Sequence, residues 1–140
     1  MNRSICTLAL LTIGLNLNAG DWTEFRGPGA QGHSNAKNLP VNWTATKNVA
    51  WKASVKSGWS SPVLYQGKVF LTTADDSLGN LLLGAVALDQ KTGKVIWEQV
   101  IFDGHERKKH KKNSDASPTI IAEGNRLYAH FGPNGTAALD

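Results

Sequence analysis

Cysteine is almost absent from this sequence, which holds one, Cys6, in 140 residues. A single thiol cannot form a disulfide within the chain or build a cysteine-ligated zinc or iron–sulfur centre. Charged residues are also few, at 19%, whereas hydrophobic residues make up 41%. This composition is that of a folded globular protein, so it excludes both a disulfide-stapled miniprotein and a disordered chain.

Long hydrophobic runs are missing except at the N-terminus, where residues 5–15 read ICTLALLTIGL. Arg3 precedes this run, and the small residues Ala19 and Gly20 follow it, which is the three-part pattern of a secretory signal peptide. The alternative is a buried N-terminal helix. A membrane-spanning helix needs about 20 apolar residues, more than this run provides. The sequence therefore predicts a signal peptide at 1–20, export to the periplasm or extracellular space, and no transmembrane anchor.

The basic charge of the chain is local. The formal net charge of +4 is of the kind that attracts nucleic acid or an anionic surface. However, the octet HERKKHKK at 105–112 holds a large share of the basic residues, and the rest of the mature chain is nearly neutral. The octet lacks the interleaved aromatic residues that stack on bases. We therefore expect a solvated basic loop, inserted over 104–114, and no nucleic-acid partner.

The remainder of the sequence repeats itself with a period of about 50 residues. SPVLYQGKVFL at 61–71 returns as SPTIIAEGNRLY at 117–128, and ALD at 87–89 returns at 138–140. The residues around Trp51 also resemble those around Trp97. A repeat of this length is typical of a propeller blade with four antiparallel strands.

Short strands separated by turns account for one repeat. β-branched and aromatic residues predict strands at 63–65, 68–73, 82–88 and 95–101. Gln66-Gly67 predicts a tight hairpin turn, since glycine adopts positive φ at little cost. Asp89 is expected to accept N–H bonds in the following turn, with Gly93 in a left-handed conformation. Trp51 and Trp97 are expected at the same strand position of successive repeats, filling the space between sheets.

These motifs resemble the pyrroloquinoline-quinone (PQQ) type of propeller repeat, over residues 21–140. Such repeats occur in quinoprotein alcohol dehydrogenases, in outer-membrane assembly lipoproteins and in exported bacterial propellers of unassigned function. The leader DWTEFRGP at 21–28 resembles the N-terminal sequence of that last group. The resemblance implies an all-β propeller of four-stranded antiparallel blades. The positions that carry the structural blade motif are Trp51, Ser61, Pro62, Gly67, Asp89, Thr92, Gly93, Trp97, Ser117, Pro118, Gly124 and Asp140.

Propellers of this family commonly have seven or eight blades, whereas this chain holds about two. We therefore expect an incomplete ring, the N-terminal fragment of a longer protein, whose remaining blades are partners within the same chain. The predicted parts are a signal peptide (1–20), a leader (21–47), a ring-closing strand (48–56), blade one (57–103), the basic loop (104–114) and an incomplete blade two (115–140) that lacks its fourth strand.

Candidate reactive residues are few. DDSLGN at 75–80 is rich in oxygen ligands, but it lacks the spacing of an EF-hand, so a turn is favoured over a calcium site. Strand alternation could point His130 inward, where a structural role is favoured over a ligand role. Arg26 is expected to tie the leader to the ring. The spacings provide no catalytic pair and no metal site, and they leave the cofactor-binding residues unknown.

Two functions remain open. The favoured hypothesis is an exported, non-enzymatic scaffold or binding module with a protein or cell-envelope partner and no evident cofactor. The alternative, implied by the resemblance, is part of a quinone-dependent dehydrogenase that uses PQQ with calcium and has most of its active site in other blades.

Overall fold

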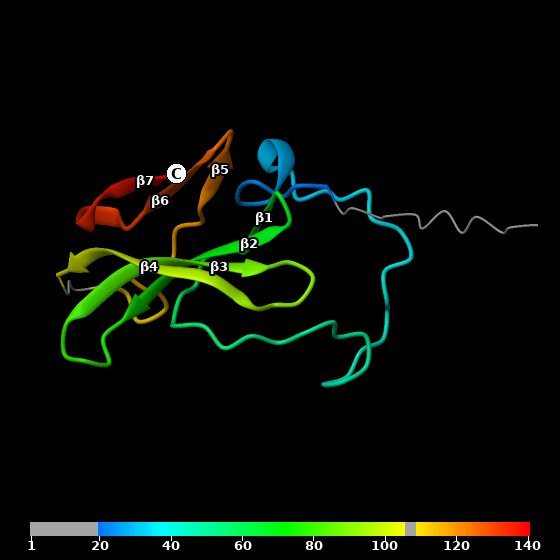
Figure 1. Cartoon of the computed structure of the whole chain (residues 1–140), viewed down its shortest axis with the longest axis horizontal. Coiled ribbons are helices and arrows are strands. Elements are labelled where there is room, and N and C mark those ends of the chain that lie inside the picture. Colours follow the sequence, from blue (N-terminus) through cyan, green and yellow to red (C-terminus); the bar gives the residue numbers. More distant parts are fainter. Residues whose placement is uncertain (1–19, 106–108) are drawn as a thin grey trace, which may run out of the picture.

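The computed structural model describes residues 20–105 and 109–140 (Figure 1). The predicted signal peptide lies outside the described residues except for Gly20, as do residues 106–108 of the basic loop. The regular secondary structure of the described chain is β-strand, apart from two short 3-10 helices. The elements are η1 (Pro28–Ala30), β1 (Val63–Tyr65), β2 (Lys68–Asp75), β3 (Leu81–Asp89), β4 (Val95–Gly104), β5 (Ile121–Glu123), β6 (Arg126–His130), η2 (Gly132–Asn134) and β7 (Thr136–Leu139).

Two antiparallel sheets form, each by pairing strands in chain order. The first has the order β1-β2-β3-β4 and the second has the order β5-β6-β7. The four strands predicted for blade one are confirmed, with β2, β3 and β4 each longer than expected. The second sheet has three strands in the described chain, as the repeat predicted. The fold is therefore an incomplete propeller of about two blades.

The two hairpin turns of the first sheet follow the sequence closely. Gln66 and Gly67 both have positive φ, at 49° and 75°, which suits the twist of a two-residue hairpin. In the β3–β4 turn, the Asp89 carboxylate accepts hydrogen bonds from the amides of Lys91 and Thr92 and from the Thr92 hydroxyl. The bonds from Thr92 lower the pKa of Asp89. Gly93 has φ of 70°, as expected for the left-handed position.

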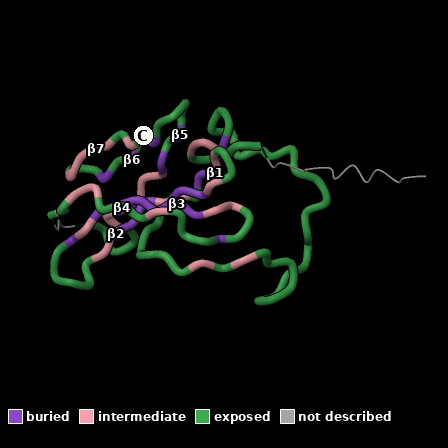
Figure 2. Tube along the Cα trace, in the orientation of Figure 1, coloured by how far each residue is buried: buried purple, intermediate pink, exposed green. Residues whose placement is uncertain are grey.

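The main hydrophobic core lies between the two sheets, where buried residues of both meet (Figure 2). The first sheet contributes Phe70 and Leu83, and the second sheet contributes Leu127. Trp97 packs against this core from β4, with its ring centroid 6.0 Å from that of Phe70. Burial of these side chains is what holds the second sheet against the first.

Trp51 lies outside the strands of the described chain, because residues 48–56 form none. Its indole instead packs on the opposite face of the first sheet, beside Val69 and Leu88, and donates a hydrogen bond to the Gln90 carbonyl at 2.9 Å. The ring-closing role predicted for 48–56 needs a neighbouring blade and stays a prediction.

His130 faces away from the core, contrary to the inward placement considered for it. Strand alternation gives the reason: Leu127 and Ala129 face the first sheet, so their neighbours Tyr128 and His130 point outward. The exposed imidazole forms a hydrogen bond of 2.8 Å with the Thr136 hydroxyl on β7.

Candidate binding site at the edges of β1 and β5

The leader lies along the free edges of both sheets. Trp22 pairs with Leu64 of β1, through amide-to-carbonyl bonds of 2.7 and 2.9 Å in the two directions. The next leader residue, Thr23, accepts a bond of 2.9 Å from the amide of Ala122 on β5. The leader therefore contacts the ring as predicted, but through the backbone of these residues rather than through Arg26.

The segments that precede β1 and β5 lie side by side. The Trp59 amide donates to the Ala116 carbonyl at 2.9 Å, and the Ser61 amide donates to the Thr119 hydroxyl oxygen at 3.1 Å. The Ser-Pro pairs of the two repeats thus come together at one junction. Within it, the Ser117 hydroxyl accepts from the Ser114 amide and donates to the Ser114 carbonyl, which fixes the loop before β5.

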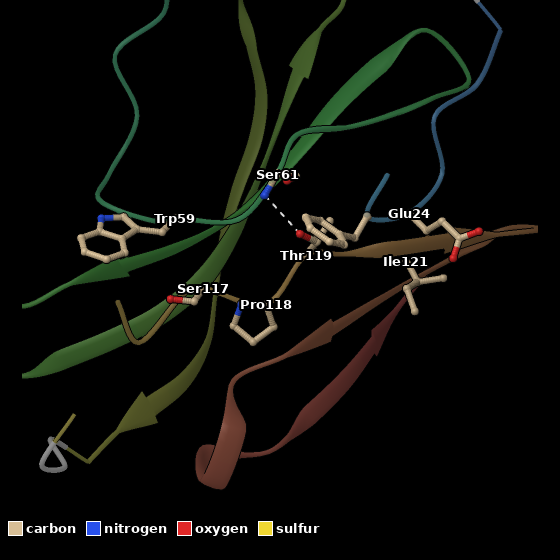
Figure 3. A pocket seen from close by; sticks show the side chains of 8 residues that line it. Glu24, Trp59, Ser61, Ser117, Pro118, Thr119 and Ile121 are labelled. Carbon is tan, nitrogen blue, oxygen red and sulfur yellow. Dashed lines mark hydrogen bonds between the residues drawn. The ribbon is translucent and has the colours of Figure 1, made fainter. Parts of the chain in front are cut away.

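An open pocket of about 410 Å³ lies where the leader meets this junction, and we call it the inner pocket (Figure 3). In Figure 3 Trp59 lies at one end, whereas Glu24 and Ile121 lie at the other. The lining residues are Glu24, Phe25, Trp59, Ser61, Ser117, Pro118, Thr119 and Ile121.

Exposed aromatic rings and neutral hydroxyls give the inner pocket its chemical character. Trp59 and Phe25 are 55% and 54% exposed, which is unusual for side chains of this size. Arg26 stacks over the Phe25 ring, with its guanidinium carbon 5.3 Å from the ring centroid. Aromatic rings beside hydrogen-bonding groups are typical of surfaces that recognise another molecule.

Of the blade-motif positions, only Ser61, Ser117 and Pro118 line this pocket. The motif residues Trp51 and Gly93 meet on the far face of the first sheet instead. The remaining members lie in turns and strands: Pro62 precedes β1, Gly67 and Gly124 lie in hairpin turns, Asp89 and Thr92 form the β3–β4 turn, Trp97 lies on β4, and Asp140 follows β7 and pairs with Arg126 at 3.3 Å.

Sequence reasoning missed Glu24, Phe25 and Trp59 as pocket residues. They come from the leader and from the segment before β1, which the repeat comparison did not place near each other. The available signal was the recurrence of Ser-Pro at the start of each blade, because equivalent positions of adjacent blades lie at the same level of a propeller.

Asp75, at the start of the oxygen-rich turn at 75–80, belongs to an ion-pair network. Lys56 binds Asp75 at 3.2 Å and Glu98 at 3.3 Å, and the Ser77 amide donates to the Asp75 carboxylate. Hydrogen bonds from Ser77, together with Lys56, lower the pKa of Asp75 from 3.8 to about 2. The same pairing raises the pKa of Lys56. Within 20–105 and 109–140, no group of three or more His, Cys, Asp or Glu residues is arranged to hold a metal ion.

This network predicts a pH-dependent effect of Asp75→Asn. Because folding lowers the pKa of Asp75, its contribution to stability is fully present above pH 4 and is lost as the pH falls through about 2. The wild-type protein should therefore have a higher melting temperature than the variant at pH 6, and the two should converge towards pH 2. Thermal unfolding by circular dichroism across this range is the measurement, and a pH-independent difference would contradict the assignment. The effect is small because Lys56 and Glu98 are partly exposed to solvent, which weakens the ion pairs.

The hydroxyl of Thr72 gives a second prediction. It is buried and lies 3.2 and 3.1 Å from the carbonyls of Ala116 and Pro118, so it ties β2 to the start of blade two. Thr72→Val keeps the shape but leaves these carbonyls without that donor, and should cost about 1–3 kcal/mol of unfolding free energy.

The matched control is Thr73→Val. Thr73 is similarly buried, but strand alternation turns its side chain to the opposite face of the first sheet, away from Ala116 and Pro118. Urea denaturation of both variants makes the comparison. An equal loss of stability would mean that the hydroxyl of Thr72 does not join the two blades.

The basic loop borders a second, smaller pocket of about 310 Å³. Lys109 forms an ion pair with Asp115, and the His105 amide donates to the Asn134 side chain at 3.0 Å, so the loop contacts blade two at these two residues.

Comparison with known proteins matches residues 34–140 to a family model of PQQ repeats described as outer membrane protein assembly factor BamB. No curated protein matches the chain. In the part of the chain that the structure describes, no helix has the length and apolar character needed to cross a membrane.

Proposed function

Because the chain belongs to the PQQ-repeat family described as outer membrane protein assembly factor BamB, we propose that it is an exported, non-enzymatic propeller module that binds a protein of the cell envelope. The observation that carries the proposal is the inner pocket, where Trp59 and Phe25 are exposed at the junction of two blades and the leader. The description of this family as an outer membrane assembly factor supports the envelope as the place of action.

A protein partner suits the chemistry of the inner pocket. Large aromatic side chains dominate the binding energy of protein interfaces, and hydroxyl groups at their edge supply directional hydrogen bonds. Trp59 provides such an anchor, and Ser61 and Ser117 provide the hydroxyls. The pocket draws on three segments held by backbone hydrogen bonds, so its shape is largely set before a partner binds.

The dehydrogenase alternative draws support from the PQQ type of the repeat and from the exposed Trp59 ring, on which a flat cofactor could stack. A quinone site with calcium also needs several carboxylate or amide oxygens around the ion. The inner pocket offers one carboxylate, that of Glu24. The lining of the inner pocket alone therefore does not fit a calcium–quinone site.

Site-specific photo-crosslinking tests the proposal. A photoreactive phenylalanine derivative is placed at position 59 of the full-length protein in intact cells. We expect discrete adducts with one envelope protein, identified by mass spectrometry. The matched control is the same replacement at Trp43, which is 69% exposed but does not line the inner pocket. Absence of an adduct at 59, or the same adducts from both positions, would contradict a binding role for the pocket.

A further inference from the structure

The leader segment, residues 21–27, contacts both sheets along its short length. Besides the backbone bonds of Trp22 and Thr23, the Asp21 carboxylate accepts a bond of 3.1 Å from the Gln66 amide in the β1–β2 turn. In Figure 1 the leader runs beside β1 and β5, which belong to different sheets. Four hydrogen bonds therefore hold these few residues across the boundary between two blades.

A tight turn at Gly27 locks the segment in place. The Gly27 amide donates to the Glu24 carbonyl at 2.9 Å, and the backbone φ of Gly27 is 69°. A Cβ atom at this position would lie 2.4–2.6 Å from carbons of the Trp22 indole ring. Only glycine allows the turn to close onto the indole, because any side chain would overlap with that ring and favour a different φ.

We propose that the leader segment is a strap that couples the first two blades, and that Trp22 and Gly27 are positioning residues for the inner pocket. The strap carries Glu24 and Phe25, which form one wall of that pocket. Docking of the strap therefore completes the wall. The coupling of blades is independent of any ligand, whereas the effect on binding rests on the proposed function.

Because the two sheets share a core of their own, we expect them to stay folded when the strap is released. The cluster of buried residues that the two sheets share includes no leader residue. Release of the strap should therefore free the edges of β1 and β5 while the sheets stay packed. The amides to follow are those of Leu64 and Ala122, since each donates to a leader carbonyl.

Hydrogen exchange on the full-length protein tests the strap through Gly27→Val. We expect exchange at Leu64 and Ala122 to become at least tenfold faster, with no change in β2 and β3. The matched control is Gly29→Val. Gly29 also has positive φ, at 66°, but the nearest atom to a Cβ there is 3.9 Å away. Unchanged exchange in Gly27→Val, or equal acceleration in the control, would overturn the strap.

Crosslinking at position 59 separates the two parts of the proposal. In a protein that crosslinks when Gly27 is present, Gly27→Val should reduce adduct yield several-fold. Faster exchange with an unchanged yield would overturn the positioning role of the strap. Failure of the wild-type protein to crosslink would overturn the proposed function, and the exchange measurement would still decide whether the strap couples the blades.

Discussion

Replacing Phe131 with alanine is expected to lower the free energy of unfolding by about 3–5 kcal/mol. Phe131 is 2% exposed and lies in the core shared by the two sheets. Its ring meets Phe102 of β4 edge to face, with centroids 5.9 Å apart and an interplanar angle of 82°. The substitution removes this contact and leaves a cavity at the blade interface, where close packing limits relaxation.

Chemical denaturation of the full-length protein measures the loss, with Phe25→Ala as the control of the same residue type. Phe25 is half-exposed, so its removal should cost under about 1 kcal/mol. Comparable losses in the two variants would mean that the two sheets do not share a core in solution.

The second large effect is expected at Gly93. Its φ of 70° disfavours any side chain, and a Cβ would lie 2.4 Å from the Trp51 ring. Backbone strain and overpacking together should make Gly93→Ala cost about 2–6 kcal/mol. The control Gly67→Ala has similar strain, with φ of 75°, but no atom lies within 4 Å of its Cβ position. It should cost about 1–2 kcal/mol.

A double-mutant cycle with Trp51→Ala identifies the cause of the Gly93 effect. If the indole is what excludes the methyl group, Gly93→Ala should cost markedly less in a Trp51→Ala background. Thermal or chemical denaturation of the four proteins provides the comparison. Strict additivity of the two losses would contradict the contact between Trp51 and position 93.

Local patterns predicted the strands and turns because each depends on neighbouring residues. β-Branched and aromatic residues at 63–65 and 95–101 favour strands locally, and Gln66-Gly67 needs no distant partner to form a hairpin. Which side chains of a strand face the core was harder to predict from the sequence. Tyr128 and His130 alternate with Leu127 and Ala129, and only the position of the first sheet decides which pair is buried.

The inner pocket and the strap could not be predicted from the sequence. Phe25, Trp59 and Ile121 line one pocket, although they are far apart in the chain. Their meeting depends on how the second sheet packs against the first. The close approach of the Trp51 ring to Gly93 was not predicted for a similar reason, because it joins residues distant in the chain.

The measurement that tests the central claim most directly is reconstitution of the full-length protein with PQQ and calcium, followed by a dye-reduction assay with alcohols and sugars. A known quinoprotein dehydrogenase serves as the positive control. A binding module built on a PQQ-type propeller predicts no dye reduction above the cofactor blank. Substrate-dependent turnover that requires both PQQ and calcium would contradict this account and establish the protein as a dehydrogenase.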